Sequence, residues 1–307
     1  MTAPGIPNEF ALSTTCFGTR LSSIQDQIFA AVGMGFRRIE LGLSEAPPTM
    51  DGLEDSRRET GMCIGSLVAG CRDAVNGTPL PATQLASLDP DERERGLNSV
   101  RRHVRLAQSW GCTTVVIRGS SVADAKLRAE SRAFDQRIED EGMSPELKEE
   151  LHAFARKVQK AGAKQVEHLC RSLFTLHQEV PDARIAIEPG AALHDLLGFD
   201  AMGWVLDDLE AQGVTYWHDV GHIHLREELG LPGQGEWLDA FGKRMAGVHL
   251  QDAADDQAEM PIGLGAVDFK LLREYVPADA ERVVEISPRH GRAEILSSVQ
   301  SLVDLGF

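Results

Sequence analysis

Four short apolar runs in the second half of the chain decide its fold: RIAIE at 184–188, TYWHD at 215–219, AGVHL at 246–250 and RVVEI at 282–286. Each run ends at or beside a side chain that can bind a metal ion, namely Glu188, Asp219, His249 and Glu285. Neighbours in this set are 31, 30 and 36 residues apart, close to the length of one strand, one helix and two loops. We therefore expect successive strands of a parallel barrel, whose carboxyl ends converge on one face.

These four side chains form a candidate ligand set of three carboxylates and one imidazole. Oxygen and nitrogen ligands of this kind suit one divalent ion, with manganese, magnesium, cobalt and zinc as the candidates. Taken singly, a strand-end carboxylate is often a helix cap, and an isolated histidine is more often structural than metal-bound. The placement of all four on consecutive strands is what indicates a metal site.

The rest of the chain continues the alternation of strand and helix, which predicts an α/β fold with one (β/α)8 TIM barrel over residues 1–307. The length is sufficient, because such a barrel needs about 250 residues. A long helical segment from Ser144 towards Pro181 is expected to break near Gly162. The eight expected strands span 10–17, 37–43, 62–69, 113–118, 184–188, 215–220, 247–251 and 282–286.

One segment exceeds the minimal barrel and is interpreted as an insertion after strand four. Residues 120–142 are dominated by Asp, Glu, Arg, Ala and Ser. Loops at the carboxyl ends of barrel strands build active sites, so a lid or a subunit contact is one interpretation. A solvated charged helix is the alternative.

Composition restricts the partners of the chain. With 31 Lys and Arg against 47 Asp and Glu, the net charge is −16, which disfavours nucleic acid and anionic membrane surfaces. The five cysteines lack a CxxC pair, and no apolar run approaches the ~20 residues that span a bilayer. We expect a cytoplasmic protein with a small-molecule substrate, and a homo-oligomer remains open.

Other side chains near the strand ends are candidates for substrate binding. His222 follows Asp219 by three residues, and Asp252 follows His249 by three residues, where it could orient a histidine or a substrate hydroxyl. Arg118 and Arg289 could bind a phosphate or carboxylate, although an unliganded surface arginine is the simpler reading of each. Trp217 either forms the bottom of a sugar pocket or fills the barrel interior.

A set of short motifs extends along the chain: Gly35-Phe36, Ile39-Glu40, Ile187-Glu188, Asp219-x-x-His222, His249-x-x-Asp252, Gly263-x-Gly265-x-x-Asp268-Phe269 and Val284-Glu285. In these motifs the chain resembles the sugar phosphate isomerase/epimerase superfamily of xylose isomerase-like barrels, including the ketose 3-epimerases. The resemblance implies that Glu188, Asp219, His249 and Glu285 bind one divalent ion and that His222 contacts substrate.

The resemblance also implies a reaction. Glu188 and Glu285 would exchange protons with a ketose-like sugar from opposite faces, through a metal-stabilised enediolate. The same site could instead serve a lyase that dehydrates a keto-inositol or related keto-sugar. A barrel that binds a sugar without turning it over is a third hypothesis.

Departures from better-known relatives narrow these choices. Xylose isomerases have a lysine soon after the strand-five glutamate, where this chain has Pro189-Gly190-Ala191, so a two-metal hydride shift is disfavoured. DNA-repair endonucleases with this barrel carry additional histidines that this chain lacks at the corresponding strand ends. His218, where relatives usually have an apolar residue, is interpreted as a core histidine facing the helix layer, with an additional polar group of the site as the alternative.

Overall fold

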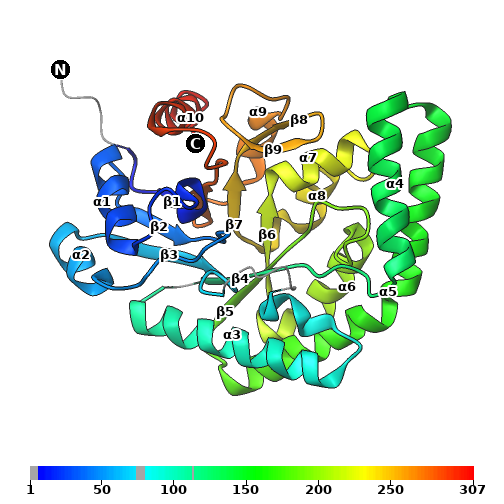
Figure 1. The fold of residues 1–307 in the computed structure, drawn as a ribbon, viewed down its shortest axis with the longest axis horizontal. Helices are drawn as coiled ribbons and strands as arrows, with labels where there is room; N and C mark the ends of the chain where they lie inside the picture. Colours follow the sequence, from blue (N-terminus) through cyan, green and yellow to red (C-terminus); the bar gives the residue numbers. More distant parts are fainter. Residues whose placement is uncertain (1–5, 74–79, 113) are drawn as a thin grey trace.

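The computed structural model describes residues 6–73, 80–112 and 114–307 and contains a closed parallel barrel of eight strands (Figure 1). The strand order around the barrel is β1-β10-β7-β6-β5-β4-β3-β2, so the predicted (β/α)8 TIM barrel is confirmed. Thr113, the predicted start of strand four, lies outside the described residues. The barrel strands are β1 Phe10–Ser13, β2 Arg38–Leu41, β3 Cys63–Val68, β4 Thr114–Arg118, β5 Arg184–Glu188, β6 Thr215–Asp219, β7 Met245–Leu250 and β10 Glu281–Val284.

Helices alternate with these strands and cover the outside of the barrel (Figure 1). Their starts follow local capping chemistry. Asp89, for example, accepts hydrogen bonds from the N–H groups of Asp91 and Glu92 at the start of α3. The helices are α1 Ile24–Met34, α2 Leu53–Thr60, α3 Pro90–Trp110, α4 Ala125–Glu141, α5 Pro145–Glu179, α6 Phe199–Asp208, α7 Val220–Glu228, α8 Gln234–Phe241, α9 Phe269–Tyr275 and α10 Arg292–Asp304.

Two sequence-based expectations were wrong in detail. The first strand ends at Ser13, because the Ser13 hydroxyl caps a 3-10 helix, Thr14–Phe17, that replaces the predicted end of the strand. Helix α5 continues through Gly162 without a break. This glycine permits close packing instead, because a Cβ there would lie 2.4 Å from Cδ2 of Leu196.

The predicted insertion folds largely as helix α4, which lies beside α5 (Figure 1). The rings of Phe134 and Phe154 are 5.2 Å apart, and Arg137 pairs with Glu150 at 2.7 Å. Lys157 and Glu130 form a second ion pair between the two helices. The segment is thus a charged helix with one apolar contact face, and a role as lid or subunit contact stays a prediction.

Two features position the candidate site and its surroundings. The inside of the barrel is packed with small and β-branched side chains around Trp217: Ala11, Val68, Val116, Ala186, Ala246 and Val283. After β7 the chain forms a hairpin of β8 Asp252–Ala254 and β9 Gln257–Met260, which Figure 1 shows near the arrowheads of β6 and β7. The sequence did not predict this hairpin.

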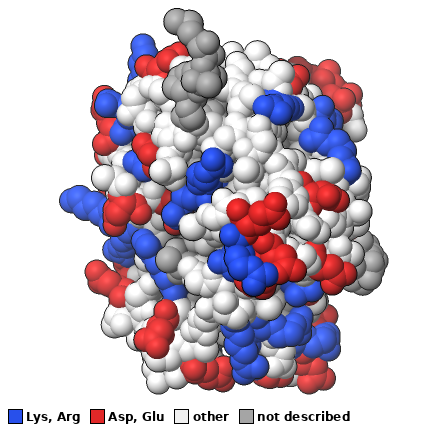
Figure 2. Space-filling view, turned by 90° about the vertical axis from the view of Figure 1, so that its left-hand side faces the viewer, with Lys and Arg blue, Asp and Glu red and all other residues white. Residues whose placement is uncertain are grey.

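On the face that carries α1 and α2, Lys and Arg are interspersed with Asp and Glu (Figure 2). Among the described residues, every helix is too short or too polar to cross a membrane.

Candidate metal and active site

The barrel brings the four predicted ligands together at the carboxyl ends of its strands. Glu188 ends β5, Asp219 ends β6, His249 lies near the end of β7, and Glu285 follows β10. All four are fully buried. From Nδ1 of His249, the distances are 3.2 Å to Oε2 of Glu285, 3.4 Å to Oδ2 of Asp219 and 3.7 Å to Oε1 of Glu188.

Two buried atoms of this cluster lack a hydrogen-bond partner in the part of the chain that the structure describes. They are Oε1 of Glu188 and Nδ1 of His249. An unsatisfied buried polar atom costs about 1–3 kcal/mol, and a cation between these atoms would satisfy both. Single ligand atoms of Glu188, Asp219 and His249 lie within 4.8 Å of one another. The residues present therefore fit a divalent ion.

The pKa shifts of His249 and Asp219 show that the cluster favours a positive charge. Although burial opposes it, the carboxylates of Glu285, Glu40 and Glu188 raise the pKa of His249 well above its ordinary value. Burial raises the pKa of Asp219, but His222 and His249 outweigh this and lower it to about 2. The carboxylates thus concentrate negative charge in a water-poor site, which is the environment that binds a cation.

Glu40, in the middle of β2, was not among the predicted site residues. Its carboxylate is fully buried and lies 3.0 and 3.2 Å from Nε2 of His249, and the Ser66 hydroxyl donates to it at 2.8 Å. The signal in the sequence that could have identified Glu40 is a carboxylate between Ile39 and Leu41, in the otherwise apolar end of the run RIEL. The sequence analysis used this glutamate only as part of a family motif.

Gln251 is a second side chain that sequence reasoning missed. Its Nε2 donates to both carboxylate oxygens of Asp219, at 3.0 and 3.2 Å. Oδ1 of Asp219 also accepts a hydrogen bond from the backbone N–H of His222, so that Asp219 caps the start of α7. Asp219 is therefore held in place by hydrogen bonds from two directions.

Arg118 joins the two predicted proton-transfer groups. Its Nε donates a hydrogen bond to Oε2 of Glu188 at 3.3 Å and lies 3.2 Å from Oε1 without hydrogen-bond geometry, and its Nη2 lies 3.3 Å from Oε1 of Glu285. The side chain is 22% exposed, unlike the buried carboxylates that it contacts. A guanidinium in this position links the two carboxylates through charge-assisted contacts.

His222 lies at the edge of the same cluster. Its Nδ1 is 3.0 Å from the carbonyl of Pro189, 3.4 Å from Oδ2 of Asp219 and 3.5 Å from Oε1 of Glu188. Donation from Nδ1 to the carbonyl leaves the lone pair of the neutral ring on Nε2. The side chain is 17% exposed, so it can reach a small molecule entering the site.

The remaining predicted substrate-binding residues lie apart from the ligand cluster or are packed. Asp252 accepts hydrogen bonds from the N–H groups of Gly263, Gly265 and Val267, and so holds the glycine loop in place. Arg289 is exposed, and its Nε donates to the Ser287 hydroxyl. Trp217 is buried in the barrel interior, with its ring 5.2 Å from that of His249. Contact of these three with a substrate stays a prediction.

Glu259, on β9, adds a carboxyl that the sequence analysis did not consider. Burial and the charge of Glu285 raise its pKa to about 7. Its backbone has a positive φ of 56° and is fixed by the N–H bond to Gln251 Oε1 and by the bond from Ser287 N–H to its carbonyl. The hairpin thus presents an acidic side chain towards the cluster.

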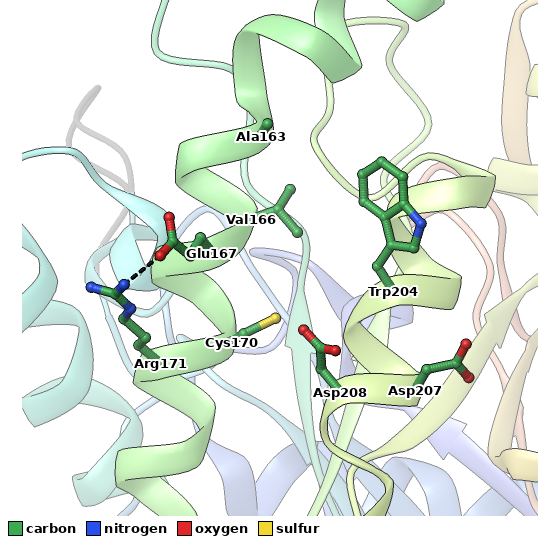
Figure 3. A pocket seen from close by; sticks show the side chains of 8 residues that line it. All are labelled: Ala163, Val166, Glu167, Cys170, Arg171, Trp204, Asp207 and Asp208. Carbon is green, nitrogen blue, oxygen red and sulfur yellow. Dashed lines mark hydrogen bonds and ion pairs between the residues drawn. The ribbon is translucent and has the colours of Figure 1, made fainter.

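A cavity of about 540 Å³ lies outside the barrel, between α5 and α6 (Figure 3). Trp204 faces Ala163 and Val166 across it. None of the predicted site residues lines this cavity, so we locate the candidate chemistry in the barrel cluster. The lining residues are Ala163, Val166, Glu167, Cys170, Arg171, Trp204, Asp207 and Asp208.

Solved structures share this architecture along nearly their whole length. A 3-keto-D-glucoside 4-epimerase from E. coli has a TM-score of 0.66 at 16% identity, covering 97% of this chain and 100% of that one. D-Psicose 3-epimerase from Clostridium cellulolyticum, solved with D-tagatose, has a TM-score of 0.64 at 12% identity and 96% coverage of both chains. The IOLI protein, solved with a zinc atom, has a TM-score of 0.60 at 14% identity, with coverages of 96% and 97%.

At these identities the similarity shows the fold. A search of curated protein sequences found no significant match. A family model, however, matches residues 28–284 and so spans most of the barrel. The chain belongs to the family of xylose isomerase-like TIM barrels.

Proposed function

We propose that this protein is a divalent-metal-dependent isomerase or epimerase that acts on a ketose-like sugar or sugar derivative. The observation that carries the proposal is the buried cluster of Glu188, Asp219, His249 and Glu285, in which two atoms without a hydrogen-bond partner, Glu188 Oε1 and His249 Nδ1, lie 3.7 Å apart. The epimerases among the structural neighbours support this reaction class. The five free cysteines support a reducing, cytoplasmic location.

In this proposal Glu188, Asp219, His249 and Glu285 hold the ion. When bound, the ion supplies Lewis acidity, which acidifies the carbon-bound hydrogen beside the substrate carbonyl. Glu188 and Glu285 then act as base and acid: one removes the proton and the other returns it from the opposite face, which inverts the carbon. Arg118 contacts both carboxylates and so holds them in position on either side of the substrate.

One further side chain, His222, orients the substrate in this mechanism. The Nε2 lone pair of His222 accepts a hydrogen bond from a sugar hydroxyl, because its Nδ1 is held by the Pro189 carbonyl. Burial of the cluster excludes water, which strengthens each of these electrostatic contacts. The partly exposed sides of His222 and Arg118 mark the direction from which the sugar enters.

The test is a screen of ketoses, keto-inositols and sugar phosphates with manganese-loaded protein in deuterated water. Epimerisation or isomerisation introduces solvent deuterium at carbon, whereas the alternative lyase releases water from the substrate. We expect Glu285→Gln and Glu188→Gln to lower turnover by about 10²–10⁴-fold, the usual contribution of a general acid or base. Glu54→Gln, on the exposed side of α2, is the matched control.

The proposal fails if Glu285→Gln, folded and loaded with metal, turns over the substrate at the wild-type rate. A protein that binds a sugar from the screen without exchanging its protons would support the non-catalytic alternative.

A further inference from the structure

We propose that Glu40 is a positioning residue: it fixes the tautomer of His249 and thereby sets the affinity of the candidate site for a divalent cation. The inference rests on the metal site of the proposed function and adds to it a residue outside the four predicted ligands.

The hydrogen bonds around His249 determine which nitrogen is available to an ion. An ionised carboxylate only accepts hydrogen bonds, so the contacts of 3.0 and 3.2 Å between Glu40 and Nε2 place the ring proton on Nε2. Nδ1 is then the nitrogen that faces the carboxylates of Glu285 and Asp219, at 3.2 and 3.4 Å, and that would give up its proton to bind an ion. Without Glu40, the ring could turn or adopt the other tautomer.

The backbone of β2 and β3 is built to hold Glu40 in this position. The register of the two strands shifts between Ile39 and Glu40, so that Ile39 pairs with Ile64 but Glu40 pairs with Ser66. A bulge of this kind changes the direction of a side chain, and it places the Ser66 hydroxyl 2.8 Å from the Glu40 carboxylate. Ser66 and His249 thus fix Glu40 from two sides in a fully buried setting.

Glu40 could alternatively be a ligand itself, because ligand atoms of Glu40, His249 and Glu285 also lie within 4.8 Å of one another. The distribution of hydrogen bonds favours the positioning role. The carboxylate of Glu40 is already engaged by Ser66 and by Nε2 of His249, whereas the two atoms without a hydrogen-bond partner, Glu188 Oε1 and His249 Nδ1, lie 3.7 Å apart on the other side of the imidazole ring. Partners of this kind orient metal-binding histidines and raise their basicity.

The experiment compares the affinity of purified, metal-free full-length variants for Mn²⁺ and Zn²⁺ by calorimetry. Glu40→Gln keeps the size of the side chain and an acceptor oxygen but removes the charge. We expect binding about 10–100-fold weaker than wild type, still with one ion per chain. Glu40→Asp, which retains the charge, should bind more tightly than Glu40→Gln. Ser66→Ala should weaken binding less than either.

The matched control is Glu281→Gln, a carboxylate on β10 that pairs with Arg38 instead of a candidate ligand. We expect its metal affinity to equal that of the wild type. Circular dichroism and thermal unfolding of each variant separate a folding defect from a binding defect. The visible spectrum of the Co²⁺ form reports coordination, and it should be unchanged in Glu40→Gln.

Three results would overturn the inference. Equal affinity in Glu40→Gln and wild type would show that the contact with His249 does not influence the ion, and would leave the proposed function intact. A changed Co²⁺ coordination spectrum in Glu40→Gln would make Glu40 a ligand. A wild-type protein that binds neither ion would remove the metal site itself, and the inference with it.

Discussion

Two buried histidines on neighbouring strands, His218 on β6 and His249 on β7, lie in opposite environments on the two sides of the barrel wall. His218 faces the helix layer, where its nitrogens contact the Tyr216 hydroxyl at 2.8 Å and Gln234 Oε1 at 2.7 Å. The side chain is fully buried with both nitrogens hydrogen-bonded, which confirms the prediction of a core histidine, and burial lowers its pKa to about 4. His249 faces the carboxylate cluster inside the barrel. The two imidazole rings are equally buried, so the neighbouring groups decide whether each ring is charged.

The largest expected difference between the two histidines is in metal binding. His249→Gln removes a proposed ligand, and we expect the affinity for Mn²⁺ or Zn²⁺ to fall by more than ~100-fold, beyond the loss typical of an outer-shell partner. His218→Gln, matched in size and burial, should bind the ion as the wild type does. Calorimetry on both folded variants makes the comparison. Equal losses in the two would show that general packing, and not the inner cluster, controls the ion.

A second difference concerns the pH dependence of stability. The folded-state pKa of His218 is about 4, below the unfolded value of about 6.5, so only the unfolded chain binds this proton between pH 6.5 and 4. Acidification through this window should therefore lower the free energy of unfolding of the wild type by about 3 kcal/mol, a loss that His218→Gln does not show. Other groups titrate equally in both proteins and cancel in the difference.

Denaturant unfolding at several pH values measures this effect. The gap in unfolding free energy between wild type and His218→Gln should be widest near pH 7 and should narrow as the pH falls to 4. A gap that stays constant over this range would mean that His218 is not held neutral by its burial.

The barrel itself could be predicted because its signals are local. Apolar runs such as RIAIE form strands wherever they pack, and Asp89 begins α3 through its own neighbouring N–H groups. The predictions at Ser13 and Gly162 were wrong because the role of each residue depends on contacts that the local sequence pattern does not show. The serine hydroxyl caps a 3-10 helix in preference to extending β1, and the glycine accommodates Leu196 from a distant loop.

The candidate site was predictable only in part. Glu188 and Asp219 stand at strand ends, so the barrel geometry alone brings them together. Glu40 was missed because its significance comes from a partner 209 residues away and from a shift in strand register, neither of which has a local signal. Gln251 and Glu259 depend likewise on the unexpected hairpin after β7.

The smallest expected effect concerns the packing that supports His249 from inside the barrel. Gly247 pairs with Trp217 across β6 and β7, and a Cβ there would lie 2.3 Å from the indole ring. We expect Gly247→Ala to lower the unfolding free energy by about 1–3 kcal/mol, as overpacking of a core does. Because the indole ring also contacts His249, displacement of the ring should weaken metal binding as well.

The control for this substitution is Gly33→Ala in α1, where an added Cβ meets no atom within 4 Å. There the loss of glycine flexibility should stabilise the fold by about 0.5–1 kcal/mol and leave metal binding unchanged. Denaturant unfolding and calorimetry separate the two sites. If Gly247→Ala destabilised the protein but bound the ion normally, Trp217 would contribute only to the barrel core, and the position of His249 would depend on its contact with Glu40 alone.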